Sequence, residues 1–404
     1  MVATQTNRYS TNISQISCQT GELGTDSHPW EQRQLGEVGL TYPGLSGKTK
    51  EDFGHGDARF VTYMNVYSNA VANSDGVEAI EKDNRQHEVR NGDVFFTGSS
   101  ETPDEVGLSS VWLGNSTDTY LNSFCFGYRP SKQLDSLFLA PSLRSPQMRS
   151  RIILLAQGIS RFNISKTQVM QLPLGFPSLP EQRRIGEFFS TLDSLIAAAE
   201  RQEALLRQKK QAYLQLMFPR EGETEPRLRF AGFSGEWETR RFGEIFQYER
   251  PDAYLAGDDE IEDEGAIPVL TANKAFILGY TNSFQGIYQK GRCIIFDDFT
   301  LDSKRVERPF KVRSSAIKIL TVRENMDFDF AFELLRTSKF PLLGHARHYI
   351  TVVQPQAALI PHSLQEQQHI GKFFSTLDSL ITAAEERTKH LRELKGSYLQ
   401  RMFV

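Results

Sequence analysis

Few features of the sequence point to a membrane, secreted or metal-binding protein. Three cysteines occur among 404 residues, Cys18, Cys125 and Cys293, and none has a partner at the spacing of a metal site or redox motif. The longest apolar runs, such as 152–156, are too short to cross a bilayer. The N-terminus lacks a charged start followed by an apolar stretch, so no secretory signal is predicted. These absences predict a cytoplasmic protein with free thiols and no membrane partner.

The net charge of −4 at pH 7 gives no general sign of nucleic-acid binding. Overall charge is a weak test, however, because the local positive surface decides such binding. One acidic run, 258–264, accounts for part of the negative sum. It lacks the alternating ligands and central glycine of a calcium loop, so it is interpreted as a solvated loop.

No motif for phosphate binding or metal-dependent cleavage is complete. Residues 47–49 read Gly-Lys-Thr, like the end of a phosphate-binding loop, but Tyr42 stands where the leading glycine is required. Residues 302–304 have the Asp-x-Lys spacing of nucleases. Their nearest upstream acids, Asp297 and Asp298, are too close in sequence for one short strand and loop to hold both arms of a metal site.

Other catalytic signatures are missing as well. His345 and His348 have no third ligand nearby, so no zinc site is predicted. The sequence contains no Gly-rich dinucleotide fingerprint and no Asn-Pro-Pro-aromatic or Asp-Pro-Pro-aromatic tetrapeptide. We therefore expect a chain that recognises a partner without catalysis, and that binds no metal or cofactor of its own.

A tandem repeat is the most specific signal in the sequence. Residues 179–218 align without gaps to residues 364–403, and the block 188–196 recurs unchanged as 373–381. Such a match indicates an internal duplication. The sequence between the copies differs, so the two halves share a frame but carry different loops.

Both copies of the repeat are predicted to be long helices. Each opens with a Ser-x-x-Glu capping box, at 178–181 and 363–366. Apolar residues then recur every seven positions, which is typical of a helix that packs along another helix. Packing of the two helices of one chain is favoured over a homodimeric coiled coil. The residues expected at this seam are Ile185, Leu192, Leu195, Leu206, Ile370, Leu377, Leu380 and Leu391.

A shorter match begins each half and completes the domain layout. Trp30-Glu31 is followed by Leu-Gly-Glu-Val, and Trp237-Glu238 is followed by Phe-Gly-Glu-Ile. The polar residues 1–29 lack periodicity and are expected to be flexible. The predicted parts are a tail (1–29), a first globular domain (30–177), a central helix (178–219), a linker (220–236), a second globular domain (237–362) and a C-terminal helix (363–404).

Both globular domains contain short β-like runs followed by polar loops, and cationic residues concentrate near those loops. Residues 158–164 and 344–350 share Gly, Arg and Ile at one spacing. Arginine and lysine suit phosphate contacts, while some of them, with Asn, Ser and Thr, can read base edges. A solvated basic face is the alternative for any single residue. The candidate DNA-binding residues are Ser99, Ser100, Thr102, Arg144, Arg149, Arg151, Arg161, Asn163, Lys290, Arg292, Lys304, Arg305, Arg308, Lys311, Arg313, Arg347 and His348.

Together these features resemble the specificity subunits of type I restriction–modification systems. The resemblance rests on two variable domains, each followed by a repeated helix that opens like 180–189 or 365–374, and on the lead 228–237 into the second half. It covers essentially everything after Trp30. Gln365 stands where the first copy has proline, a small departure. The fold implied is α+β, with two mixed α/β target-recognition domains separated by two long antiparallel coiled-coil helices in pseudo-two-fold symmetry.

The resemblance also implies partners and a division of labour. Each target-recognition domain would bind one half of a split, asymmetric site in double-stranded DNA, and the helices would fix the gap between the halves. Two modification subunits would bring S-adenosylmethionine and flip out the target adenine. Restriction subunits would add ATP-driven translocation, with ATP and Mg²⁺ bound there rather than on this chain. Two alternatives remain open: a self-contained restriction–modification enzyme, and a coiled-coil adaptor without a nucleic-acid role.

Overall fold

The computed structural model describes residues 30–115, 117–131, 134–271, 276–341 and 347–403. Cys18 and His345, which entered the sequence interpretation, and the tail 1–29, expected to be flexible, lie outside these ranges. The chain divides into two compact units. Unit 1 contains the described residues up to Ala197 and those from Lys389 onward, and unit 2 contains Ala198–Thr388. Among the described residues, no helix combines the length and apolar character needed to span a bilayer.

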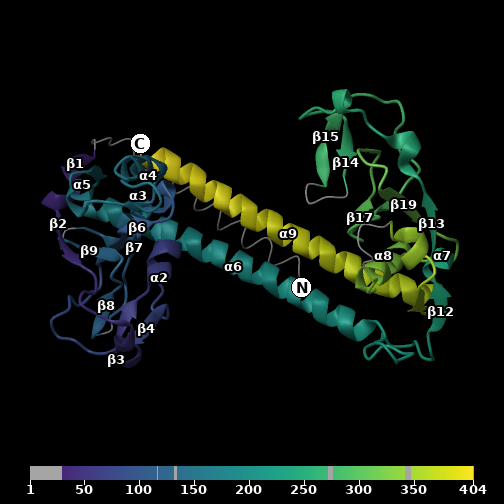
Figure 1. Cartoon of the computed structure of the whole chain (residues 1–404), viewed down its shortest axis with the longest axis horizontal. Coiled ribbons are helices and arrows are strands. Elements are labelled where there is room, and N and C mark those ends of the chain that lie inside the picture. The colour runs from purple at the N-terminus through teal and green to yellow at the C-terminus, as the bar shows by residue number, and fades with distance from the viewer. Residues whose placement is uncertain (1–29, 116, 132–133, 272–275, 342–346, 404) are drawn as a thin grey trace. The chain divides into compact units, whose positions relative to one another are not determined.

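Unit 1 is a mixed α/β domain closed by parts of two long helices (Figure 1). Its larger sheet has the strand order β2-β9-β5-β7, its smaller sheet has the order β4-β3-β8, and the pairs β1-β11 and β6-β10 complete it. The strands are β1 (Glu31–Gln34), β2 (Gly39–Pro43), β3 (Phe53–Val61), β4 (Val77–Ile80), β5 (Val94–Thr97), β6 (Ser99–Ser100), β7 (Ser109–Val111), β8 (Thr119–Leu121), β9 (Cys125–Pro130), β10 (Phe162–Asn163) and β11 (Pro173–Phe176). The short helices are α2 (Tyr63–Ser68), α3 (Ser136–Leu143), α4 (Pro146–Ile153) and α5 (Lys166–Met170).

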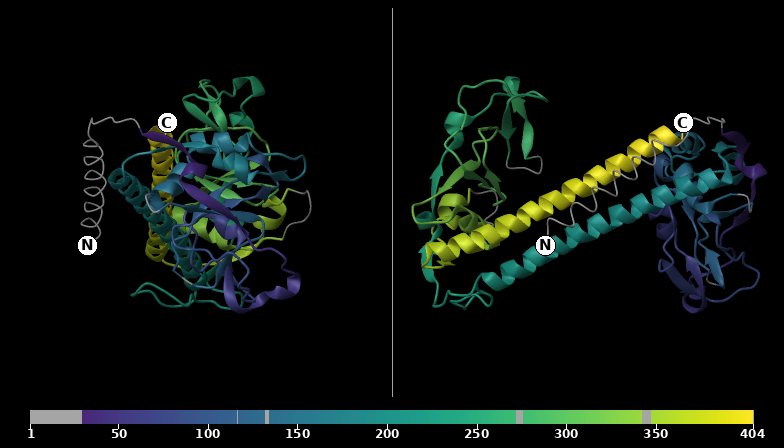
Figure 2. Two further views of the ribbon diagram at one scale, coloured as in Figure 1. Left: turned by 90° about the vertical axis from the view of Figure 1, so that its left-hand side faces the viewer. Right: turned by 180° about the vertical axis from the view of Figure 1, so that it is seen from behind.

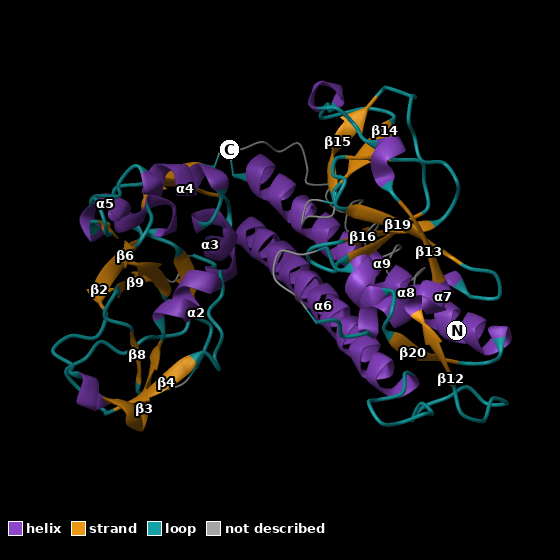
Figure 3. Cartoon of the chain, turned by 45° about the vertical axis from the view of Figure 1, so that its right-hand side comes forward, coloured by secondary structure: helices purple, strands orange, loops and turns teal. Residues whose placement is uncertain are grey.

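Unit 2 repeats this architecture. Its larger sheet is ordered β13-β19-β16-β17, its smaller sheet β15-β14-β18, and β12 pairs with β20. The strands are β12 (Glu238–Arg241), β13 (Phe246–Glu249), β14 (Ile267–Leu270), β15 (Ile277–Thr281), β16 (Cys293–Asp297), β17 (Ser303–Val306), β18 (Lys311–Val312), β19 (Ile317–Val322) and β20 (Ala357–Ile360). The shorter helices are α7 (Phe242–Ile245) and α8 (Phe328–Thr337), which Figure 3 labels beside the larger sheet. Helix α8 contacts β17 and β19.

The two units therefore share one topology in spite of their different sequences. In each, the larger sheet is antiparallel, and the central strand of the smaller sheet pairs antiparallel with one neighbour and parallel with the other. Each domain also begins and ends on one antiparallel pair, β1-β11 or β12-β20. The sequence match at Trp30 and Trp237 therefore marks a duplication that extends through the whole fold.

The repeated segments form α6 (Leu179–Met217) and α9 (Leu364–Met402). In unit 1, Phe188 packs edge-on against Tyr398, with ring centres 4.9 Å apart. In unit 2, Phe373 packs in the same way against Tyr213 at 5.0 Å. Because Phe188 and Phe373 occupy one repeat position and the two tyrosines another, each unit holds the same antiparallel contact. The helix segments of each unit can be followed in Figure 1 and, from behind, in Figure 2.

The predicted seam is correct in one of its two rows. Ile185, Leu192, Ile370, Leu377 and Leu391 are buried, and Leu206 is half-buried. The second row was wrong for Leu380, which is 47% exposed, and Leu195 is only half-buried. Ile196 and Ile381 are buried in their place. The buried positions still recur every seven residues, as Ile370, Phe374, Leu377, Ile381 and Ala384 show, but the second row lies four rather than three residues after the first.

Each globular domain rests on its long helix through the same polar junction. In unit 1, the Gln182 side chain accepts the backbone N–H of Asp135 (3.0 Å) and donates to the carbonyl of Pro177 (2.8 Å). Gln367 makes the same two contacts in unit 2, with Asp327 and Pro361. The repeated glutamine thus joins the N-terminus of a domain helix to the preceding strand. It serves domain attachment, which the seven-residue pattern did not reveal.

The repeated glycine beside this glutamine allows the close approach. A Cβ on Gly186 would lie 2.8 Å from the backbone of Leu137 and Phe138. A Cβ on Gly371 would lie 2.7 Å from the Phe330 backbone nitrogen. Glycine is therefore required where α3 and α8 begin, since the helix surfaces touch backbone to backbone.

Candidate nucleic-acid interface

Two predicted loop segments of unit 1 lie side by side. Strand β6 pairs with β10, which sets Ser99 opposite Asn163 and Ser100 opposite Phe162. The amide of Gly98 donates to the carbonyl of Phe124 at 2.7 Å, and this brings the turn before β9 to the same place. Three segments far apart in the sequence thus form one surface.

An arginine, the exposed ring of Phe124 and the half-buried ring of Tyr63 mark this surface. The Arg161 guanidinium lies 5.4 Å from the centre of the Phe124 ring, and Phe124 is 53% exposed. Tyr63 donates its hydroxyl to the carbonyl of Ser99 at 2.8 Å, which fixes its ring beside them. Asn163 is exposed next to Arg161. We name Tyr63, Phe124, Arg161 and Asn163 the Arg161 patch; it offers a cation, a stacking face and an amide to one ligand.

Two other arginines predicted to contact DNA are structural. Arg144 donates to the backbone carbonyls of Val66, Tyr67, Asn69 and Ser109 at 2.6–3.0 Å, and burial lowers its pKa to about 10. Arg149 donates to the carbonyls of Asp104 and Val106. These two positions are corrected to structural ones because their guanidinium groups already serve carbonyl groups of the domain. Arg151 is half-buried and donates to the carbonyl of Pro173, and its contact with DNA stays a prediction.

The serines of the predicted loop are also occupied. Ser99 and Ser100 are buried in β6, and Ser100 donates its hydroxyl to the carbonyl of Thr102. Thr102 itself is exposed. The predicted base-reading role is therefore corrected for the two serine side chains and stays a prediction for Thr102.

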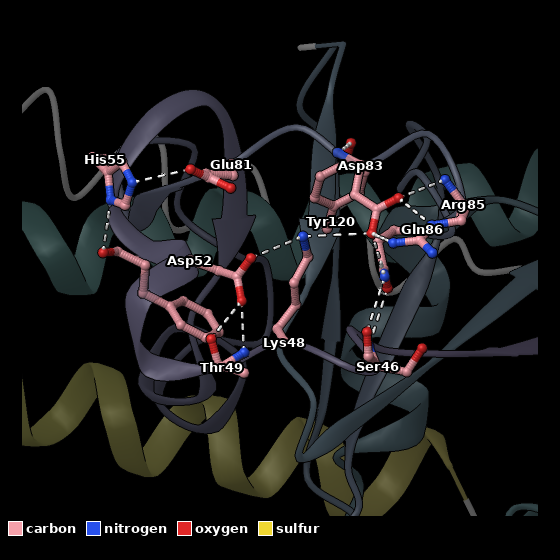
Figure 4. Close-up of polar contacts among 11 residues, drawn as sticks. Ser46, Lys48, Thr49, Asp52, His55, Glu81, Asp83, Arg85, Gln86 and Tyr120 are labelled. Carbon is pink, nitrogen blue, oxygen red and sulfur yellow. Dashed lines mark hydrogen bonds and ion pairs between the residues drawn. The ribbon is translucent and has the colours of Figure 1, made fainter.

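Lys48, the lysine of the incomplete phosphate motif, belongs to a polar cluster at the smaller sheet of unit 1 (Figure 4). Lys48 lies 3.4 Å from both Asp52 and Asp83, with its side chain only 10% exposed. Asp83 also accepts hydrogen bonds from the Arg85 side chain, which, with further hydrogen bonds, lower the pKa of this carboxyl. Lys48 is therefore a brace between two carboxylates, and the rejection of a phosphate-binding loop stands.

In unit 2, the basic run 304–313 divides between different environments. Successive side chains of β17 point to opposite faces of the sheet. The amine of Lys304 lies 4.9 Å from the centre of the Phe276 ring. Its neighbour Arg305 instead pairs with Asp329 (2.9 Å) and Asp378 (3.0 Å). A strand presents successive side chains to opposite faces, so a run of charges in sequence does not form one charged face.

An open pocket lies at the end of this strand. It is lined by Leu270, Phe276, Arg305, Val306, Glu307 and Arg308. Arg308 is exposed and has no ion pair among the described residues. With Lys304 over Phe276, this Arg308 pocket combines cations and an aromatic ring, as the Arg161 patch does with different residues.

Most of the other predicted cations of unit 2 have partners or are buried. Lys290 pairs with Glu249, and Arg292 pairs with Glu307 and Asp329. Arg313 is half-buried, and Arg347 is exposed. Lys311 and His348 are corrected to structural residues: Lys311 is 2% exposed and paired with Glu260, and His348 is fully buried.

The structure also shifts one predicted correspondence. Ile164 donates its amide to the carbonyl of Gly98, and His348 donates its amide to the carbonyl of Asp298. Gly98 and Asp298 are equivalent because they follow the corresponding strands β5 and β16. Each donates its amide to the carbonyl of the residue directly before β9 or β19. His348, rather than Ile350, is thus the structural counterpart of Ile164. Residues 344–346 of the predicted match lie outside the described ranges.

The carboxylates near the Asp-x-Lys sequence have structural roles. Asp297 is buried and accepts the amides of Phe299 and Thr300, and Asp298 pairs with Lys318 at 3.0 Å. Among the described residues, no group of three potential ligands is arranged to hold a metal ion.

The two described cysteines are buried. Burial raises the pKa of the Cys293 thiol to about 12 and also raises the pKa of the Cys125 thiol, which disfavours the reactive thiolate.

The duplicated architecture corresponds to a known family. The family model for the type I restriction modification DNA specificity domain matches the chain twice, over residues 27–208 and 234–393. The chain belongs to this family. The two matches of the type I specificity family fall on the two halves that the repeat and the shared topology define.

Relatives of the type I specificity family show the same pattern. The specificity subunit of the type I restriction enzyme EcoR124I/EcoR124II of Escherichia coli is 37% identical over 179 residues, which make up 41% of this chain and 43% of that protein. The alignment thus spans less than half of that relative. The putative type I restriction enzyme MjaX specificity subunit of Methanocaldococcus jannaschii is 22% identical over 397 residues, 93% of this chain and 92% of that protein.

Two solved structures share the fold. The S subunit of a type I restriction–modification system from M. genitalium matches with a TM-score of 0.66 at 16% identity, over 95% of this chain and 98% of that one. A structure from work on complex assembly and conformational transition of the type I R-M system matches with a TM-score of 0.51 at 17% identity, over 93% and 98%. The mixed α/β domains with long packed helices are therefore those of type I S subunits.

Sequence reasoning missed the aromatic members of both surfaces. Phe124, Tyr63 and Phe276 lie far in sequence from the arginine or lysine that each accompanies. Only Phe124 could have been found from the sequence. It follows Ser123 in a turn, directly before a buried strand, which is an unusual place for a phenylalanine. Cationic residues alone were therefore an incomplete guide to these surfaces.

Proposed function

We propose that the chain is the DNA-binding specificity subunit of a type I restriction–modification complex, with target-recognition domains at residues 30–177 and 237–362. One observation carries this proposal: the two domains share the strand order and the pairing directions of both sheets, yet present different side chains on their loops. A duplicated frame with unlike loops is what recognition of two unlike half-sites requires. We infer a bipartite, asymmetric site in double-stranded DNA.

The Arg161 patch and the Arg308 pocket are the surfaces proposed to meet DNA. Arginine binds phosphates or guanine edges, and an exposed ring stacks on bases or supports the guanidinium. Exposed Asn163 adds a group able to pair with adenine. Thr102, Lys304, Arg313 and Arg347 remain candidates for contacts around these surfaces.

The helices α6 and α9 are proposed to set the number of unread base pairs between the half-sites. Support comes from the identical antiparallel contact that they make in each unit. A fixed register in both units would make the helix pair a rigid spacer, and the repeated surface would present equivalent docking sites to two modification subunits.

Catalysis is proposed to reside on the partner subunits in the cytoplasm. Two methyltransferase subunits would supply S-adenosylmethionine and act on a flipped adenine, and restriction subunits would supply ATP-driven translocation with Mg²⁺. The occupied carboxylates around Asp297 and Asp302 support a non-catalytic role for this chain. Purified chain alone, incubated with DNA and labelled methyl donor, is expected to transfer no label, and any transfer would establish a self-contained enzyme instead.

Selection from a random duplex pool tests DNA recognition. With modification subunits present, the selected sequences are expected to contain two short motifs with a constant gap. A continuous palindrome, or no enrichment at all, would contradict the proposal and, in the second case, favour an adaptor without a nucleic-acid role.

Matched substitutions assign the domains to the half-sites. Arg161→Ala is expected to weaken binding about 10- to 100-fold and to relax preference in one half-site only. Arg308→Ala should relax the other half-site. Arg90→Ala is the control, because Arg90 is an exposed arginine of unit 1 outside the Arg161 patch. Equal losses for Arg90→Ala and Arg161→Ala would remove the patch from the interface.

A further inference from the structure

The loop that leads into β10 carries an isoleucine in water. Ile159 is 96% exposed, more than any other large apolar residue among those that the structure describes. A single exposed apolar residue is ordinary on a protein surface. The place in which this one is held is what distinguishes it, because it lies two residues from Arg161 in the Arg161 patch.

Backbone contacts close the loop around Ile159. The amide of Gln157 donates to the carbonyl of Asn163 at 2.9 Å, and the amide of Asn163 donates back to the carbonyl of Gln157 at 2.8 Å. Gly158 has a φ of +145°, and a Cβ on it would lie 2.0 Å from the carbonyl oxygen of Arg161. Only glycine allows so tight a turn. The tip of the loop is therefore held out by its backbone, without packing of the Ile159 side chain.

The loop is part of a narrow β-ribbon. Asn163 pairs antiparallel with Ser99 of β6 and also forms the bridge to Gln157. Residues 159, 161 and 163 stand at alternate positions of this segment, and all three are exposed. The major groove of DNA is wide enough to admit a two-stranded β-ribbon. The ribbon thus presents an aliphatic side chain, a guanidinium and an amide to one ligand.

These three groups match different features of base edges. A guanidinium suits guanine or a phosphate, and an amide suits adenine. In the major groove, thymine differs from every other base by its 5-methyl group, which is recognised by apolar contact. Arg161 and Asn163 cannot make that contact with their polar groups, whereas Ile159 can.

We propose that Ile159 contacts the 5-methyl group of one thymine in the half-site bound by unit 1. This inference rests on the proposed DNA-binding function and adds to it a residue that determines sequence without charge or hydrogen bonds. Uracil keeps every hydrogen-bonding group of thymine and lacks only the methyl group, so it removes this contact alone.

Duplexes with single thymine-to-uracil replacements test the contact. The full chain, with modification subunits, is used with the bipartite sequence obtained by selection, and each thymine of both half-sites is replaced in turn. One replacement, in the half-site that Arg161→Ala relaxes, is expected to weaken binding about 3- to 5-fold, as the loss of one buried methyl group predicts.

Substitutions of Ile159 assign the contact to this side chain. Ile159→Ala should bind the thymine and uracil duplexes equally, and Ile159→Val should keep the preference for thymine. Leu40→Ala is the matched control, because Leu40 is 77% exposed on β2, where it lies opposite Arg129 of β9. This control should keep the full preference.

Several results would overturn the contact. They are a selected sequence in which no thymine is sensitive to uracil, and a sensitivity that Ile159→Ala preserves or that Leu40→Ala also abolishes. If Ile159→Ala weakens both duplexes equally and reduces the bend of the DNA measured by fluorescence energy transfer, the side chain is a wedge between base steps instead. If it prevents assembly with the modification subunits in the absence of DNA, Ile159 belongs to a protein interface. Failure to select any sequence would refute the DNA-binding function itself, and this contact with it.

Discussion

The two units use the same helix positions but different charges to attach their domains. Lys210 and Lys395 occupy one repeat position, and each binds the repeated aspartate, Asp378 or Asp193, at 2.5–2.6 Å. In unit 2, Lys210 also binds Glu333 of α8 at 2.9 Å, with the Glu333 side chain 1% exposed. In unit 1 the corresponding residue of α3 is Pro141, beside a small cavity of about 40 Å³.

The next helical turn reverses the contrast. Arg144 of unit 1 is half-buried on four carbonyl groups, whereas its counterpart in unit 2, Arg336, has a side chain that is 45% exposed. The better covered charge that each domain brings to the junction thus differs in position and in sign, Arg144 in unit 1 and Glu333 in unit 2. The duplicated helices thus present the same residues to both domains. How much each helix residue contributes to the stability of its unit depends on the domain residue that it contacts.

The largest expected effect separates the two identical lysines. Lys210→Met leaves the buried Glu333 with only the longer contact of Arg336, at 3.7 Å, so the free energy of unfolding should fall by up to about 3–5 kcal/mol. Lys395→Met exposes only Asp193, already 43% exposed, and should cost about 0–1 kcal/mol. Chemical denaturation of both variants measures the difference. Should Lys210→Met fail to fold, Lys210→Met with Glu333→Met is expected to recover the fold; equal costs for the two lysines would refute the contrast.

The matched arginines should differ in the opposite sense. Arg144→Ala leaves carbonyl groups of α2 and β7 without a donor and should cost about 1.5–3 kcal/mol. Arg336→Ala removes a side chain that is 45% exposed and lies 3.7 Å from Glu333, and should cost about 0–1 kcal/mol. Thermal unfolding of the two variants provides the test. A larger loss of stability for Arg336→Ala than for Arg144→Ala would contradict the contrast between the two arginines.

Glycines at the junction are expected to behave alike in both units. Gly186→Ala and Gly371→Ala would overpack a backbone contact, at about 1–3 kcal/mol, less about 1 kcal/mol gained in helix propensity. Gly396→Ala is the control, since nothing lies within 4 Å of its added Cβ, and it should stabilise by up to about 1 kcal/mol. A gain for all three alanines would rule out close packing at the junction.

The smallest effect is a pH dependence confined to unit 2. Burial raises the pKa of Glu333 above its usual 4.5, in opposition to the attraction of Lys210. The folded state therefore holds this proton more tightly, so the associated stability is present at low pH and is lost as pH rises through the raised pKa. Relative to Glu333→Gln, the native chain should lose stability as the pH rises through the raised pKa of Glu333. Denaturation of both chains at acidic and neutral pH checks the sign, and a native chain that gains stability would contradict it.

The sequence was sufficient for the frame because the frame is periodic or repeated. The capping boxes at 178–181 and 363–366 and the recurring apolar residues predicted two helices, and α6 and α9 are found there. The exposed Leu380 shows the limit of this reasoning, because a row placed three instead of four residues after its neighbour selects a different side chain as buried. The role of Gln182 was likewise invisible, since it depends on where α3 begins.

The candidate site was less predictable, because side chains of charged residues find partners that sequence distance hides. Arg144 and Lys311 looked like surface cations, but the first meets carbonyl groups of two other elements and the second meets Glu260. Phe124 and Arg161 meet only once β6, β9 and β10 are placed together. Only pairing and burial distinguish a structural cation from one that is left to bind a ligand.

The sharing of α9 between the units has a consequence for the order of folding. Phe403 lies in the same core as Phe138 and Phe189, within unit 1. During synthesis Phe403 is added ~200 residues after Phe189, a delay of about 10–40 s at roughly 5–20 residues per second. The domain translated first is thus completed last, and its apolar helix face stays uncovered while the ribosome makes the whole of the second domain.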